Sequence, residues 1–225
     1  MFSDLNILFE GGNFWRLLSG LWTSMQIALF SMVLSVILGA VLGIIMTSTS
    51  KTVFIVSQAY LQFIRIMPQL VLLFLVYFDL TRGFGISLDA KVAAILVFTL
   101  WGTAEMGDLV RSALQSIPRH QYESARALGI EGREMFVHII VPQAIRGLLP
   151  ATINLTNRMI MTTSLVVLIG VVEVLKVAQQ IIDANRFTYP GAALWVYGVV
   201  FILYFAVCFP IAWGSRKLES RWKLS

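Results

Sequence analysis

The feature that most constrains the fold is the stretch 17–50, which contains no charged side chain. About 20 apolar residues in a helix cross the hydrocarbon core of a bilayer, because each residue adds about 1.5 Å. The stretch therefore predicts a membrane-spanning helix at about 21–46. Gly39 and Gly43 inside it form a small-xxx-small pair, which is typical of closely packed membrane helices.

The composition extends this prediction to the whole chain. Of 225 residues, 58% are hydrophobic and 13% are charged, whereas a soluble domain carries about a quarter charged residues. We therefore predict an all-α integral membrane protein with five transmembrane helices. They fall at about 21–46, 53–80, 90–113, 147–172 and 190–215. The transmembrane domain, 19–216, lies between an external N-terminal tail or interfacial helix at 1–18 and a tail at 217–225.

Orientation follows from the distribution of Lys and Arg, which are enriched on the cytoplasmic side of membrane proteins. With five spans, the polar loop 116–146 lies on the same side as the C-terminus. That side carries ten Lys and Arg residues, against five on the other side. We therefore expect an external N-terminus, a cytoplasmic loop and a cytoplasmic C-terminal tail. The amphipathic stretch 173–189 is then external.

The polar loop carries the signals of short helices. From Ser116 to Pro150 it reads SIPRHQYESARALGIEGREMFVHIIVPQAIRGLLP. Pro118 suits the first turn of a helix, where its missing N–H costs nothing. Gly129 stands where a residue with positive φ ends that helix. A second helix, 131–141, is expected to stop at Pro142. This composition fits both an ordinary solvated loop and a helix that docks on a partner.

A resemblance favours the docking helix. Glu123 to Gly129, with Ile145 and Leu149-Pro150, resembles the EAA loop of bacterial ABC importer permeases. That loop carries Glu-Ala-Ala, three residues, Gly and, further on, Ile-x-Leu-Pro; here Ser124 replaces the first Ala. Other segments resemble the polar amino acid uptake subfamily. They are Ile64–Pro68, Ala104–Met106 with Arg111, Pro142–Ala144 and Thr163–Leu165.

The resemblance implies a type I importer permease, a non-catalytic membrane subunit that carries a polar or charged amino acid across the bacterial cytoplasmic membrane. The implied coupling residues are Gln121, Glu123, Ser124, Ala125, Leu128 and Gly129. The implied partners are a separate ATPase dimer, which binds ATP and Mg, a second permease subunit, identical or related, and an external amino-acid-binding protein. No cofactor or nucleic acid is expected on this chain.

Three charged residues, Arg65, Glu105 and Arg158, fall near the middle depth of the predicted spans. A lone charge there costs at least ~2.5–3.5 kcal/mol, so each needs a partner or a water-filled cavity. One interpretation is a structural Arg–Glu pair, and the other is a polar pathway for a zwitterion. The hydroxyls that would add hydrogen bonds to this pathway belong to Thr162, Thr163 and Ser164. Asp108 and Arg111, spaced i, i+3, are expected to pair locally.

Two other function classes stay open. An ion- or proton-coupled carrier or channel would use the same three charges as its path. An integral membrane enzyme would need clustered carboxylates or histidines, whereas His120 and His138 are isolated. The sequence has no G-x-x-x-x-G-K-[ST] phosphate loop and no H-E-x-x-H or C-x-x-C metal motif, so we expect ATP hydrolysis to come from another chain. The resembling subfamily carries Lys where this chain has Met161, so the identity of the substrate is not carried over.

Overall fold

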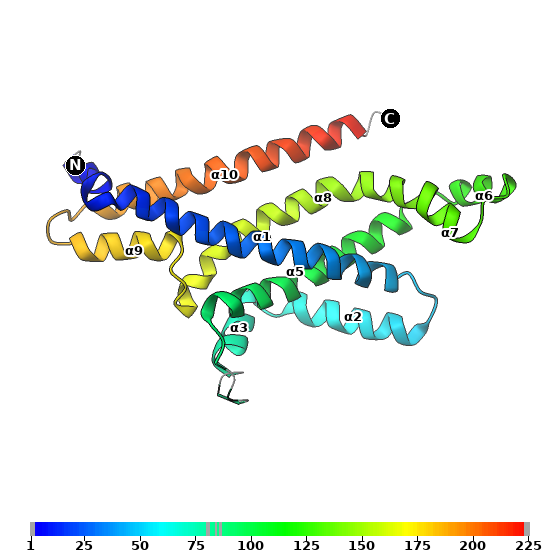
Figure 1. Cartoon of the computed structure of the whole chain (residues 1–225), viewed down its shortest axis with the longest axis horizontal. Helices are drawn as coiled ribbons and strands as arrows, with labels where there is room; N and C mark the ends of the chain where they lie inside the picture. Colours follow the sequence, from blue (N-terminus) through cyan, green and yellow to red (C-terminus); the bar gives the residue numbers. More distant parts are fainter. Residues whose placement is uncertain (1–2, 80–81, 84, 86, 223–225) are drawn as a thin grey trace. The chain divides into compact units, whose positions relative to one another are not determined.

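The computed structural model describes residues 3–79, 82–83, 85 and 87–222, and every regular element in this part of the chain is helical. Figure 1 shows the helices in chain order. Their bounds are α1 Asn13–Ile45, α2 Lys51–Ile66, α3 Gln69–Phe74, α5 Ala90–Gln115, α6 Arg119–Ala127, α7 Gly132–Met135, α8 Val141–Thr162, α9 Val174–Asn185 and α10 Ala192–Trp222. Short 3-10 or π segments adjoin several of them.

Four helical segments of the described residues are long and apolar enough to cross a membrane. They are Glu10–Ile45, Ala90–Gln115, Gly132–Ile169 and Ala192–Ser220. A further candidate is a broken span, Lys51–Ile66 with Gln69–Asp79. The predicted all-α membrane fold is confirmed, and it reaches five crossings when the broken pair counts as one.

This candidate span is broken, whereas the sequence predicted a continuous helix at about 53–80. The helix is interrupted at Met67 and Pro68, where both residues have extended backbone. A proline restricts the residue before it to extended backbone, and Met67 has φ −70° and ψ 128°. Beyond the bend, α3 continues as a π-helical turn, Leu75–Asp79. Residue 80, the expected end of the span, lies outside the described residues.

The expected stop at Pro142 is wrong. Helix runs from Gly132 to Ile169 through α7, a π-helical turn at Phe136–Ile140, α8 and a 3-10 segment at Thr163–Ile169. A π turn widens the helix by one residue, which accommodates a proline that follows it directly. At about 1.5 Å per residue, these 38 residues exceed the ~30 Å of hydrocarbon. Part of this helix therefore extends beyond the lipid.

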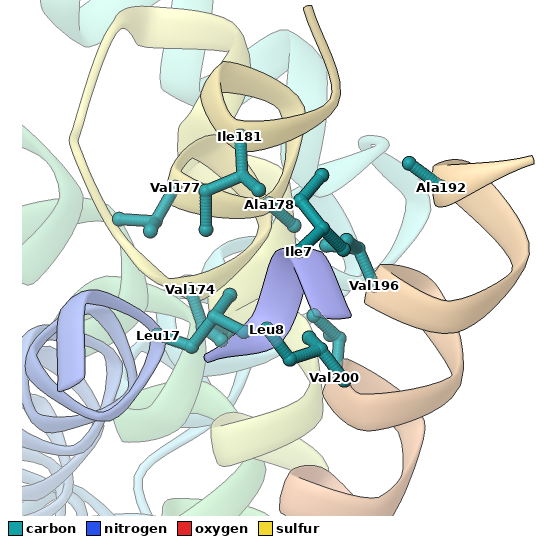
Figure 2. Close-up of a cluster of buried hydrophobic side chains, with 10 residues drawn as sticks. All are labelled: Ile7, Leu8, Leu17, Val174, Val177, Ala178, Ile181, Ala192, Val196 and Val200. Atoms are coloured by element: carbon teal, nitrogen blue, oxygen red, sulfur yellow. The ribbon is translucent and has the colours of Figure 1, made fainter. Parts of the chain in front are cut away.

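The chain forms two compact units. The first comprises the described residues of 1–31, 68–98 and 158–210, and the second those of 32–67, 99–157 and 211–225. Figure 2 shows the apolar core of the first unit. Its buried side chains come from the N-terminal segment, α1, α9 and α10: Ile7, Leu8, Leu17, Val174, Val177, Ala178, Ile181, Ala192, Val196 and Val200.

The N-terminal segment belongs to this core. Ser3–Leu8 is a 3-10 helix, and Ile7 and Leu8 are buried. The Nδ2 of Asn13 donates to the Ile7 carbonyl at 2.8 Å, which ties the segment to the start of α1. The short helix thus packs against α9 and α10, rather than forming an exposed tail. Which side of the membrane it occupies stays a prediction.

The small-residue pair in α1 serves close packing, as predicted, within the second unit. A Cβ on Gly39 would lie 2.5 Å from the Cβ of Met106, and one on Gly43 would lie 2.7 Å from the carbonyl oxygen of Gly107. Contacts of this length are not tolerated, so α1 approaches α5 only because these positions lack side chains.

A third close approach in α1 gives a testable prediction. A Cβ on Gly20 would lie 2.7 Å from the Cα of Val174, where the backbone of α9 begins. Backbone cannot rotate aside, so we expect Gly20→Ala to lower the free energy of unfolding by about 1–3 kcal/mol. The measurement is the thermal unfolding midpoint of the purified protein in detergent.

Gly198 in α10 is the matched control, because a Cβ there would meet nothing within 4 Å. Gly198→Ala should be neutral, or stabilising by up to about 1 kcal/mol, since alanine favours helix. Equal midpoints for the two variants would contradict the close packing of α1 on α9.

Candidate functional site

The loop helix α6 ends in a sharp bend at Gly129. Gly129 has φ +74°, and its N–H donates to the carbonyl of Arg126 at 2.9 Å. The N–H of Ile130 donates to the carbonyl of Ala125 at 3.0 Å. These two bonds define a Schellman motif, which satisfies the last carbonyls of a helix and favours glycine. The predicted positive φ at Gly129 is confirmed. Pro118 lies one residue before the first helical position.

The faces of α6 differ in exposure. Glu123, Ser124 and Gly129 are exposed, whereas Ala125 is only 2% exposed. Leu128, a large apolar side chain at the tip of this polar helix, is 77% exposed. A single exposed leucine is common on protein surfaces, so any role for Leu128 rests on its place at the tip of α6.

Gln121 fixes α6 to the long helix that follows. The Nε2 of Gln143 donates to the Oε1 of Gln121 at 3.2 Å and to the carbonyl of Ile139 at 2.9 Å. Gln143 belongs to α8, so this amide pair joins α6 to the start of α8. In Figure 1, α6 and α7 lie together at this end of α8.

Four charged residues of α2 and α5 form one network within the second unit. The Nε of Arg65 donates to Glu105 at 2.9 Å, and its Nη1 lies 2.9 Å from Asp108. Arg111 lies 2.6 Å from the other oxygen of Asp108, as its i, i+3 spacing predicts, and it also donates to Gln115 at 3.1 Å. Two arginines and two carboxylates carry no net charge together. The structure therefore contains the expected Arg65–Glu105 pair, and it adds Asp108.

The remaining predicted pathway residues belong to the first unit, at the end of α8. Thr162 donates to the carbonyl of Arg158 at 2.8 Å, Thr163 to that of Ile160 at 2.7 Å. Ser164 donates to the carbonyl of Met161 at 3.0 Å. Thr163 is fully buried, whereas Arg158 is exposed. All three hydroxyl hydrogens are thus bonded to the helix backbone, and the hydroxyl oxygens stay acceptors. A role for these residues in transport remains a prediction.

One buried acid was not singled out from the sequence. Glu173 is fully buried and precedes α9, where its carboxylate accepts from the N–H groups of Leu175 and Lys176, both at 2.9 Å. The hydroxyl of Ser24 lies 3.3 Å from the same carboxylate. An acid directly before an amphipathic helix is a recognisable N-cap signal. Burial raises the pKa of Glu173 above its ordinary value, against these hydrogen bonds, which lower it.

Comparison with known proteins agrees with this arrangement. Residues 35–223 match the family described as "Binding-protein-dependent transport system inner membrane component". The "Probable amino-acid ABC transporter permease protein PatM" of Vibrio harveyi is 35% identical over 83% of this chain and 86% of its own. The "Probable glutamine ABC transporter permease protein GlnP" of Bacillus subtilis is 28% identical over 90% and 91%.

Among solved structures, an amino acid ABC transporter crystallised with histidines is similar to this chain. It superposes with a TM-score of 0.83 at 25% identity, over 92% of this chain and 94% of that one. The likeness covers nearly the whole chain, so it applies to the bundle and the loop helix alike.

Glu173 gives a pH-dependent prediction. Its pKa is raised in the folded protein, so its contribution to stability is fully present below the unfolded-state value and is lost as pH rises through the folded-state value. The variant Glu173→Gln keeps an acceptor but does not titrate. Relative to this variant, the wild type should lose stability as the pH rises above 4.5, the ordinary pKa of a glutamate side chain. Unfolding midpoints of both proteins, measured across this range, test the prediction.

Glu173→Ala distinguishes the contribution of the helix-capping hydrogen bonds from that of the titratable charge. Without an acceptor, it should lose about 0.5–2 kcal/mol at every pH. If the wild type and Glu173→Gln had parallel midpoint–pH curves, the buried titration would be disproved.

Proposed function

The chain belongs to the family of binding-protein-dependent transport system inner membrane components, and from that membership we propose that it is the permease subunit of an ATP-driven importer of amino acids. It is a multi-pass membrane protein and a transport component. Relatives along most of its length are described as amino-acid permeases of ABC transporters, which supports an amino acid as the substrate.

The observation that carries the proposal is the geometry of α6. A permease without a phosphate loop needs a contact through which a separate ATPase acts. The Schellman bend at Gly129 holds Leu128 in the open, and Gln121 is bonded to Gln143 of α8. A groove on the ATPase that takes Leu128 and the exposed face of Glu123 and Ser124 would therefore move α8, which carries the candidate pathway residues at its other end.

The partners follow from this division of labour. The family name supplies a binding protein, which would deliver the amino acid on the external side. An ATPase dimer would bind ATP and Mg on the cytoplasmic side, and a second permease, identical or related, would complete the pathway. The excess of Lys and Arg near α6 supports its cytoplasmic position, with the N-terminus outside and the C-terminus inside.

The network of Arg65, Glu105, Asp108 and Arg111 suits a zwitterionic cargo. An α-carboxylate that binds Arg65 and an α-ammonium that binds a carboxylate leave the total charge of the site at zero. Exchange of partners within the network thus avoids a lone charge in the span, the state that is most costly in lipid. We propose separately that Arg158 and the hydroxyls of Thr162, Thr163 and Ser164, in the first unit, contribute polar contacts to the substrate.

Leu128→Asp tests the proposed function. The substitution changes an exposed side chain without altering the backbone bend, so the protein should insert and unfold as the wild type does. A buried aspartate at the ATPase contact should weaken co-purification of the ATPase at least about tenfold, which is about 1.4 kcal/mol. ATP-driven amino acid uptake into proteoliposomes should fall with it.

Phe187→Asp is the matched control. Phe187 is 85% exposed and follows α9, on the side predicted to be external. This variant should keep the ATPase bound. If Leu128→Asp retained both the ATPase and uptake, the proposed contact through α6 would be contradicted. If uptake persisted without ATP and collapsed with the ion gradient, the chain would be an ion-coupled carrier instead.

A further inference from the structure

A small open pocket on the first unit is lined in part by Ser164, one of the predicted pathway residues. It has a volume of about 330 Å³ and lies between the end of α8, the start of the 3-10 segment and the middle of α10. Its lining residues are Met161, Ser164, Phe201, Tyr204, Phe205 and Cys208. Met161 and Ser164 flank Thr162 and Thr163 in the sequence, and Ser164 is itself one of the proposed pathway residues.

We propose that this cavity receives the side chain of the transported amino acid and selects an uncharged, apolar side chain, either aromatic or sulfur-containing. The proposal rests on the importer function proposed above and narrows the substrate class of the same pathway. It excludes the charged amino acids that the resemblance to the polar amino acid subfamily allows.

The lining carries no charged side chain. An ionised side chain taken from water into an apolar cavity loses its hydration, and this loss is compensated only by a counter-ion in contact with it. None of the six lining residues supplies one. A lysine, arginine, aspartate or glutamate substrate would therefore enter unpaired, whereas an apolar side chain loses nothing.

The surfaces in the cavity match sulfur and aromatic groups. The rings of Phe201 and Phe205 stack with centroids 6.3 Å apart and an interplanar angle of 20°. Aromatic rings interact favourably with other rings and with thioethers, and a methionine side chain adapts to irregular shapes. Met161 can therefore adjust to the occupant, and the volume lies at the lower end of the range for ligand pockets.

Two hydroxyls favour an amino acid over a lipid tail. The Tyr204 hydroxyl is buried and lies beside Thr163, Ser24 and Glu173. The Ser164 hydroxyl donates to the Met161 carbonyl, and its oxygen stays an acceptor. The oxygens of both hydroxyls can accept a hydrogen bond from the polar end of an amino acid, whereas an acyl chain carries no donor.

Cys208 provides a direct measurement, because it lines the cavity and is the only cysteine of the chain. The importer complex, purified through a tag on this chain, is treated with N-ethylmaleimide, and modification of Cys208 is followed by mass spectrometry. At a ligand concentration about ten times Kd, occupancy should slow the reaction about tenfold. We expect this protection from L-methionine or L-phenylalanine, and none from L-arginine or L-glutamate.

Met161→Lys should reverse the selectivity, because it places a cation in the cavity. Protection by methionine should be lost, and glutamate should protect instead. Ile202→Ala is the control, because Ile202 is an exposed α10 residue outside the lining; it should behave as the wild type. Protection by charged amino acids alone, protection by added phospholipid but by no amino acid, or a thiol that never reacts would each overturn the proposal.

ATP-driven uptake by the same complex in proteoliposomes tests the cavity proposal and the importer function separately. Uptake of methionine or phenylalanine, with none of arginine, agrees with the cavity. ATP-driven uptake of charged amino acids alone would overturn the cavity proposal and leave the importer function intact. ATP-dependent transport of no amino acid at all would overturn both.

Discussion

The compensation of charge inside apolar helices is the interaction on which the rest of this structure depends. Arg65 contacts Glu105 and Asp108, and Arg111 binds the second oxygen of Asp108. The side chain of Glu105 is 14% exposed and that of Arg65 36%, so the pair is neither sealed nor freely hydrated. Such pairs hold helices together and can still exchange partners, which a fully desolvated pair resists. We propose that stability and transport draw on the same side chains.

Backbone hydrogen bonds flank the break at Pro68: the N–H of Met67 donates to the carbonyl of Phe63 at 3.2 Å, and the N–H of Val71 donates to that of Pro68 at 2.9 Å. A helix broken inside a membrane exposes backbone groups, which must be satisfied by neighbouring protein. Arg65 lies three residues before the break, and its bonds to α5 hold the end of α2 in place. The cytoplasmic input proposed for α6 reaches a different part of the molecule, through Gln121, Gln143 and the long helix Gly132–Ile169. The charged network and the proposed coupling contacts of α6 therefore involve different residues.

Local rules predicted much of this arrangement. The conformation of Gly129 followed from helix-end chemistry, and the Asp108–Arg111 pair followed from helical spacing. The break at Pro68 was missed, because proline is tolerated within membrane helices and its presence alone does not distinguish a kink from a break. The contact between Arg65 and Asp108 joins residues of two helices, and helical periodicity carries no information on such pairs. Pro142 was overinterpreted, since the π turn before it depends on the surrounding packing.

A double-mutant cycle on Arg65 and Glu105 tests the central claim most directly. The free energy of unfolding is measured in detergent for the wild type, Arg65→Met, Glu105→Gln and the double variant. If the two charges stabilise each other in the span, the destabilisations of the two single variants should add up to more than that of the double variant. The difference is the coupling energy, which we expect to be about 0.5–3 kcal/mol. Strictly additive effects would show that the pair contributes nothing, and the compensated network would not be what holds α2 to α5.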